Sequence, residues 1–388
     1  MKSPLSFILD PFSLEEFLSG YHQRQALHIK GRQDKFRQLF GWNKLNDILN
    51  SSPQPHPGVK MSQGGKQFRP KDATALIRAV QGGATLILEN ADRYDLVLGD
   101  FLNRLTEEIG EETRLNLYLS YPENQGYRNH YDTQDFFILQ VSGYKEWLVF
   151  PETIPSVLFF QKKHSTEAPP QESCYLHCKL GSGDVLYVPR GHWHHAIAHD
   201  EPSVHLTLAM FDRTGIDFMK WLVDELTDYE QFRRTLPVSL TGKKGVVDHR
   251  IAEWLEQLKI DLARVLNEPD LYERFLKYRA ATSRNRQPFQ FPDQTELSVG
   301  DLLSATRFRR RVQRAHISLD KLAGRVEVVC SGRRLMFDRE AETVIRFVFS
   351  CEEFTKEELL ALPVMISWQA VCSILLPLIK EGCVLPVE

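Results

Sequence analysis

The stretch His130-Tyr131-Asp132-Thr133-Gln134-Asp135-Phe136-Phe137-Ile138-Leu139-Gln140 gives the strongest indication of how this chain folds. A histidine and an aspartate stand two residues apart, just before a continuous apolar run. Residues i and i+2 of a strand project from the same face of a sheet, so His130 and Asp132 are expected to point together, with Tyr131 turned away. The run from Phe136 to Leu139 is typical of a strand that is buried on both faces.

A second segment, Pro189-Arg190-Gly191-His192-Trp193-His194-His195, supplies further imidazoles. Two histidines and one carboxylate are the protein ligands that hold Fe(II) on one face and leave the opposite coordination positions open. The two segments together therefore predict an iron-dependent oxygenase. The spacing alone does not choose among His192, His194 and His195 as the third ligand.

The residues around these segments indicate a β-barrel. Strands are expected at 175–180 and 185–188, joined by a turn at 181–184 and followed by a turn at 189–191. Upstream, alternating positions form an apolar stripe (Leu115, Leu117, Leu119) and a polar stripe (Asn116, Tyr118, Ser120). The polar stripe either faces solvent or lines the interior of a barrel that holds a small ligand. The sequence pattern does not decide between these two.

Taken in this order, the segments resemble the JmjC-type, cupin-fold protein hydroxylases that use Fe(II) and 2-oxoglutarate, and in particular their ribosomal oxygenase group. The resemblance also rests on Gly143-Tyr-Lys145-Glu-Trp147 and on Gly183-Asp184-Val-Leu-Tyr187-Val-Pro189. It is strong across about residues 85 to 210 and weaker outside them.

The resemblance implies a role for each matching residue. His130, Asp132 and His194 fall on the iron ligands of the family, which selects His194 among its neighbours. Lys145 falls on the basic residue that pairs with the distal carboxylate of 2-oxoglutarate, as an ammonium in a partly dry pocket can. Tyr118 falls on a pocket-lining position of the cofactor site. Without the resemblance, Lys145 also fits a solvated lysine beside a turn.

The implied reaction is oxidative decarboxylation of 2-oxoglutarate to succinate and carbon dioxide, coupled to hydroxylation of an amino-acid side chain. A ribosomal protein is the expected substrate. Alternatives are a hydroxylase of a peptide natural-product precursor or other small substrate, and a cupin that works without 2-oxoglutarate. Lysine demethylation is a variant of the first reaction, and the oxidised residue is not evident from the motif.

The resemblance also implies the domain organisation. Residues 1–212 are expected to form a mainly β catalytic domain, a double-stranded β-helix of the JmjC/cupin type with N-terminal helices. Three- and four-residue apolar steps predict helices from Asp217 to about Ala281. In the resembling group such helices pair two subunits, so residues 213–282 are expected to be a dimerisation region of a homodimer. A winged-helix-like α+β domain is expected over 283–388, and the polar stretch between Thr282 and Asp293 is expected to be a linker.

Composition agrees with a globular enzyme. The chain has 388 residues, 42% hydrophobic and 26% charged, with a net charge of −3 that gives no global reason for nucleic-acid binding. No apolar stretch is long enough to cross a membrane, and the N-terminus lacks a signal-peptide core, so a cytoplasmic protein is expected. The six cysteines are scattered and predict no disulfide framework. Cys174, His177 and Cys178 lack a second ligand pair at zinc spacing.

Two features leave alternatives. His205, in a predicted strand after the site, is expected to be a packed core histidine that touches the pocket at most. A basic cluster is predicted either to contact RNA or an acidic partner, or to be a solvated helix face; its members are Arg307, Arg309, Arg310, Arg311 and Arg314. If it binds nucleic acid, a regulator whose barrel is a relic becomes the competing function.

Overall fold

A computed structural model gives the fold. It describes residues 3–51, 56–122, 128–164, 170, 173–199, 201–237, 249–282, 289–312, 315–320 and 324–387. The chain forms two compact units that divide between Asp212 and Arg213. No helix in the described part of the chain is both long and apolar enough to span a membrane.

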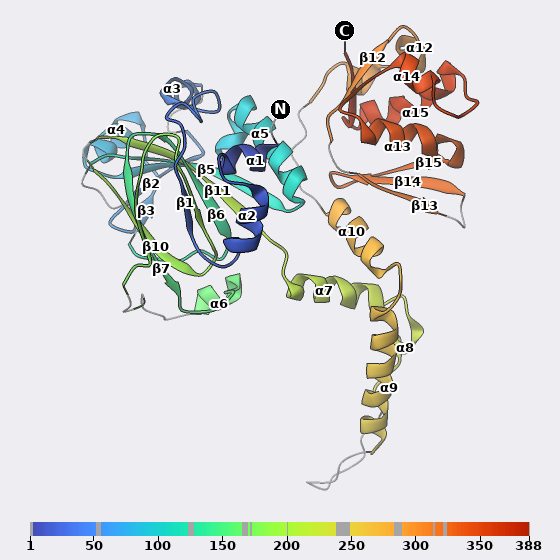
Figure 1. The fold of residues 1–388 in the computed structure, drawn as a ribbon, viewed down its shortest axis with the longest axis horizontal. Helices are drawn as coiled ribbons and strands as arrows, with labels where there is room; N and C mark the ends of the chain where they lie inside the picture. Colours follow the sequence, from blue (N-terminus) through green and yellow to red (C-terminus); the bar gives the residue numbers. More distant parts are fainter. Residues whose placement is uncertain are drawn as a thin grey trace. The chain divides into compact units, whose positions relative to one another are not determined.

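The first unit is built on two β-sheets (Figure 1). The larger sheet has eight strands in the order β1-β9-β6-β11-β5-β4-β2-β3, and the smaller has three in the order β10-β7-β8. The strands are β1 Leu27–Ile29, β2 Val59–Gln63, β3 Lys66–Phe68, β4 Thr85–Leu88, β5 Glu112–Ser120, β6 Asp135–Ser142, β7 Lys145–Glu152, β8 Leu176–Leu180, β9 Val185–Val188, β10 His192–Ala198 and β11 Ser203–Phe211.

The continuous apolar run of β6 is explained by the layers on its two faces. Phe136 and Ile138 pack with the small sheet, whereas Phe137 and Leu139 belong to the core beneath the helices. Those helices are α1 Pro4–Leu9, α2 Leu14–Gly20, α3 Trp42–Asn50, α4 Ala73–Gln81 and α5 Leu96–Ile109; α6 Phe159–His164 follows β7. The prediction that this strand is buried on both faces is therefore confirmed.

Local sequence signals begin and end these elements. Ser13 and Glu16 form the reciprocal capping box that starts α2. The β6–β7 turn requires a glycine, because Gly143 has φ +69° and a Cβ there would lie 2.2 Å from the Pro202 carbonyl oxygen. This tight turn sets the start of β7 and therefore the position of Lys145.

The second unit begins with helices, as the periodicity predicted. They are α7 Gly215–Leu226, α8 Glu230–Arg233, α9 His249–Leu266 and α10 Leu271–Ala281. Trp221, Leu222, Val265 and Leu271 form a small buried cluster. Other apolar residues of these helices are exposed in the single chain; Leu255 and Leu266, for example, are each 44% exposed.

The rest of the second unit mixes helices and short sheets around its own apolar core. A hairpin around Ser331 is formed by β14 Arg325–Cys330 and β15 Arg333–Asp338, and β14 also pairs with β13 His316–Asp320. The other elements are α11 Asp293–Glu296, α12 Val299–Leu302, β12 Arg307–Arg310, α13 Glu342–Ser350, β16 Glu353–Thr355, α14 Lys356–Leu360, α15 Trp368–Lys380 and β17 Val384–Val387. The order is compatible with a winged-helix-like module, which stays a prediction.

The described arginines of the basic cluster do not lie on a helix, so the solvated helix face, one of the two explanations offered for the cluster, is wrong for them. Arg307 and Arg309 are in strand β12, between β16 and β17, and both pair with Glu353, at 3.4 Å and 2.6 Å. A strand forms because Phe308, between the two arginines, is fully buried against Phe354. Arg314 and most of the predicted linker, residues 283–288, lie outside the described residues.

Candidate metal and co-substrate site

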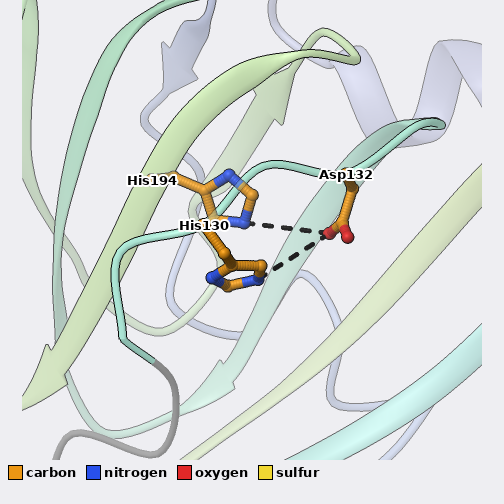
Figure 2. Close-up of side chains that lie close together, drawn as sticks. All are labelled: His130, Asp132 and His194. Carbon is orange, nitrogen blue, oxygen red and sulfur yellow. Dashed lines mark ion pairs between the residues drawn. The ribbon is translucent and has the colours of Figure 1, made fainter. Parts of the chain in front are cut away.

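The three side chains predicted to bind metal converge in the first unit (Figure 2). One carboxylate oxygen of Asp132, Oδ2, lies 4.0 Å from His130 Nε2 and 3.8 Å from His194 Nε2. The three ligand atoms all lie within 4.8 Å of one another, which leaves a position between them for an ion. His130 and Asp132 come from one segment of the chain and His194 from strand β10.

The backbone brings these distant segments together through a single bridge rather than through a regular strand. His130 N donates to His194 O at 3.1 Å, and His194 N donates to His130 O at 2.7 Å. Asp132 follows in a loop, where its carbonyl accepts from Gly191 N at 2.8 Å. The expectation of an extended strand through residues 130–132 is therefore wrong, although the two side chains do converge. Tyr131 turns away and packs on Trp193, as expected.

Both imidazoles are oriented for metal binding through Nε2. The Nδ1 atom of His130 lies 2.9 Å from Arg128 O, and that of His194 lies 3.0 Å from His192 O. A carbonyl oxygen can only accept, so each Nδ1 carries a proton, and in the neutral ring this leaves a free lone pair on Nε2. Burial, followed by the nearby charge of His130, lowers the pKa of His194 to about 3, which keeps this ring neutral. The donor set thus fits Fe(II).

The two other histidines of the segment have different surroundings. His192 is buried, its Nδ1 is 2.7 Å from the Tyr175 hydroxyl, and burial lowers its pKa to about 4. His195 borders the cavity and stacks on Phe150 at a ring distance of 5.8 Å. Neither belongs to a group of donors close enough to share an ion, among the described residues.

The ligand triad opens into a cavity of about 330 Å³. Its walls come from both sheets, and apart from Asp132 the lining contains no described carboxylate; the lining residues are Gln67, Thr85, Tyr118, His130, Asp132, Phe136, Ile138, Lys145, Trp147, Lys162, His194, His195, Ala196, His205 and Thr207. The polar stripe of β5 thus faces inward, since Tyr118 lines the cavity and Ser120 is buried.

Lys145 is buried in the wall of this cavity. It is 6% exposed and donates to Ser120 Oγ at 3.0 Å, which in turn lies 3.0 Å from Thr85 Oγ1. Burial lowers the pKa of this ammonium to about 7. No described carboxylate lies within ion-pairing distance of it. A buried cation with only hydroxyl partners is costly, and an incoming carboxylate offsets that cost.

The sequence assigned no role at this site to three residues that line the cavity. Trp147 follows Lys145 by two positions on β7, and His205 pairs in register with Tyr118, so strand periodicity was a usable signal for both. Lys162 gave no such signal. It lies on α6 and its ammonium is 3.3 Å from Asp132 Oδ1. The expectation that His205 is buried is confirmed, and it also lines the cavity.

Two other groups of metal-binding residue types have internal partners. His177 Nε2 lies 2.5 Å from Glu146, and Cys178 is buried. A cluster of His22, Asp135 and Asp212 brings donor atoms together. In that cluster Asp135 already accepts from the Tyr187 hydroxyl and from Arg190 N. These hydrogen bonds join Asp135, the first residue of β6, to the neighbouring strand β9 and to the turn at Arg190.

Comparison with known proteins agrees with the geometry. Residues 98–218 match the family model of the JmjC domain. Ribosomal oxygenase 1 of Gallus gallus is 29% identical over 277 residues, which cover 65% of this chain and 46% of that protein. The bifunctional lysine-specific demethylase and histidyl-hydroxylase NO66 of Drosophila grimshawi is 27% identical over 220 residues, 54% of this chain and 30% of that protein. The chain thus spans less than half the length of these relatives.

Solved structures show the same fold over almost the whole chain. The ribosomal oxygenase YcfD of Escherichia coli matches with a TM-score of 0.60 and 14% identity, covering 97% of this chain and 99% of that chain. A structure of YcfD in complex with cobalt and 2-oxoglutarate matches with a TM-score of 0.58 and 14% identity, covering 97% and 98%. The predicted β-rich catalytic fold of the JmjC/cupin type is therefore confirmed.

Proposed function

Because this chain contains a JmjC domain and is a homologue of the ribosomal oxygenases, we propose that it is an Fe(II)- and 2-oxoglutarate-dependent dioxygenase. It hydroxylates an amino-acid side chain of a protein, and a ribosomal protein is the favoured substrate. The observation that carries this proposal is one cavity that holds both a His-Asp-His donor set and a buried lysine without a carboxylate partner.

The residues would divide the work as follows. His130, Asp132 and His194 hold the metal through Nε2, a carboxylate oxygen and Nε2. Lys145 binds the distal carboxylate of 2-oxoglutarate, and Tyr118 lines the space between. When bound, the iron and 2-oxoglutarate supply the oxidising chemistry, in which dioxygen is consumed and succinate and carbon dioxide are released.

The protein itself contributes fixed ligand orientations and a site that is shielded from water. The Nδ1 hydrogen bonds of the two histidines fix their rings before metal arrives, so little reorganisation is needed. Lys145 lies 6% exposed and His194 3% exposed, whereas Asp132 and His130 are partly open to solvent. This gradient supports a co-substrate at the closed end and a protein side chain at the open end.

The competing regulator hypothesis has less support. A relic barrel would have no reason to keep three oriented metal donors and an unpaired buried cation. In addition, Arg307 and Arg309 of the basic cluster share Glu353, which reduces the charge they offer to a nucleic acid. We therefore favour the enzyme.

Homodimerisation through the helices of residues 213–282 is part of this proposal. Apolar side chains on α9 are exposed in the single chain: Leu255 by 44%, Ile260 by 54% and Leu266 by 44%. We infer that the same helices of a second copy cover these exposed side chains. Sedimentation of the purified chain, compared with a Leu255→Glu/Ile260→Glu variant, tests it; a monomeric wild type would contradict it.

The test of function uses ribosomes from cells that lack the gene. They are incubated with the purified protein, Fe(II), ascorbate and 2-oxoglutarate, and intact ribosomal proteins are weighed by mass spectrometry. We expect one protein to gain a single oxygen atom with wild type and with the matched control His177→Ala, whose exposed imidazole lies outside the cavity. His130→Ala should give no gain.

Other outcomes redirect the proposal. Formaldehyde release from a methylated peptide would make the enzyme a demethylase. Turnover of 2-oxoglutarate without oxidation of any ribosomal protein would point to another peptide or small substrate. If the metal-loaded protein does not bind 2-oxoglutarate at all, the proposed dioxygenase function is wrong.

A further inference from the structure

His205 lies at the closed end of the cavity, beside Lys145. It is 2% exposed and lines the cavity together with Thr207, two residues further along β11. In the sheet it pairs with Tyr118 on β5 and with Gln140 on β6. The residue is therefore in the centre of the larger sheet, where its backbone is held on both sides.

Aromatic neighbours fix the plane of the His205 ring. It stacks on Tyr118 with a ring distance of 5.1 Å and an interplanar angle of 5°. The Trp147 ring meets it edge-on at 5.8 Å and 77°, and the same indole lies 6.1 Å from the ring of His194. Trp147 thus stands between the metal ligand and His205, and the imidazole has little freedom to turn.

Two residues that line this end of the cavity each have a ring nitrogen that no described protein group satisfies. His205 Nδ1 and Trp147 Nε1 are both buried without a hydrogen-bond partner among the described residues. Burial, and next the charge of Lys145, hold the pKa of His205 well below its usual range, so the ring is neutral and carries one N–H. Trp147 Nε1 is a donor, and one of the two nitrogens of His205 is a donor as well; buried polar groups without partners are rare in native proteins.

We propose that His205 binds 2-oxoglutarate, donating its N–H to the distal carboxylate that Lys145 also contacts. This inference rests on the proposed dioxygenase function. A carboxylate has about four lone-pair sites, more than one ammonium fills. A neutral imidazole adds a directed donor without a second positive charge next to Lys145. The stack on Tyr118 aims that donor, and Trp147 closes the wall beside it.

The experiment measures binding to Co(II)-loaded protein without oxygen, so no turnover is involved. His205→Phe removes the donor and keeps a ring against Tyr118; His205→Leu is a second apolar variant. We expect either variant to bind 2-oxoglutarate about 10- to 100-fold more weakly, the loss typical of one hydrogen bond to a charged group. His205→Asn and His205→Gln place an amide near Nδ1 and Nε2 respectively, and one of them should recover most of the affinity.

A second ligand shows which end of the co-substrate His205 contacts. 2-Oxopentanoate has the same chain and the same 2-oxo acid but no distal carboxylate. 2-Oxopentanoate should bind more weakly than 2-oxoglutarate binds to wild type. Its affinity should be the same for wild type and for the apolar variants. Co(II) affinity should be unchanged in all variants, and so should the behaviour of the control His177→Phe, which alters an exposed histidine on β8.

The outcomes separate the two proposals. Wild-type protein that fails to bind 2-oxoglutarate overturns the dioxygenase function. Wild-type binding together with equal binding by any folded apolar variant overturns only the role of His205. Equal losses for 2-oxoglutarate and 2-oxopentanoate would also overturn it, because His205 would then act on the shape of the cavity and not on the distal carboxylate.

Discussion

Each of the two units buries a charged side chain in a sheet, and the two charges are treated in opposite ways. In the second unit, Glu327 on β14 is 6% exposed and pairs with Lys277 and with Arg334, whose Nε lies 2.7 Å away. In the first unit, Lys145 is equally buried but donates to a hydroxyl. Of these two side chains, only Glu327 has oppositely charged partners among the described residues.

The difference distinguishes a structural charge from a binding charge. A buried ion with well-placed partners can hold elements together, here α10 and two strands of a hairpin. A buried ion without them costs stability, and the cost is removed when a ligand of opposite charge binds. The described groups of metal-binding residues also lie in the first unit. The proposed metal ligands and the buried lysine without a described counter-ion therefore share one cavity.

The largest expected effect is on co-substrate binding. Lys145→Met should weaken binding of 2-oxoglutarate by about 100-fold or more, because it leaves a carboxylate in a dry pocket without its cation. Calorimetry on the Co(II)-loaded protein measures it. Lys145→Arg, which keeps the charge, should retain part of the affinity. Unchanged binding by the Met variant would show that Lys145, like Glu327, is not a ligand-binding charge.

The same lysine makes binding depend on pH. Since burial lowers the pKa of Lys145 to about 7, the free protein loses this charge as the pH rises above 7. Affinity for 2-oxoglutarate should fall between pH 7 and pH 9, by up to about tenfold per pH unit. Lys145→Arg stays protonated and should show no such fall. A flat wild-type profile over this range would contradict the prediction.

Stability should move in the opposite direction from binding. Without ligand, Lys145→Met should raise the free energy of unfolding at pH 6 by roughly 2 to 4 kcal/mol, because an ammonium is charged and desolvated only in the folded chain. Between about pH 7 and pH 10.5 the unfolded wild type holds this proton and the folded one does not. Wild type should therefore gain stability as the pH rises, and the advantage of the variant should shrink. Urea titrations at pH 6 and pH 9 measure both.

Removing the paired charge should have the smallest effect. Glu327→Gln should destabilise the chain by about 1 to 2 kcal/mol, since Arg334 is 64% exposed and regains water when its partner is lost. Denaturant midpoints measure this change. Binding of 2-oxoglutarate should be the same as in wild type. A gain in stability, of the size expected for Lys145→Met, would show that the two buried charges do not differ.

The metal donors could be predicted because they combine rare residue types in short segments. Strand alternation, turn glycines and the capping box of α2 are also visible in the sequence, because each depends on neighbours along the chain. Strand periodicity also contained information on Trp147 and His205, once β7 and β11 are known to face one cavity. Lys162 could not be predicted, because its contact with Asp132 joins α6 to a loop about thirty residues earlier. The strand at Arg307 was missed because only the burial of Phe308 against Phe354 favours it.

The sequence by itself determined the ligand types, the alternating strands and the layer on each face of β6, because these follow from the chemistry and period of adjacent residues. Tertiary structure decided which lysine is left without a counter-ion and which histidine lacks a hydrogen-bond partner. Both depend on what lies across the cavity, and segments distant in the chain meet there only after two sheets have closed on each other. Desolvation is a property of that closed space, so no local pattern could specify it.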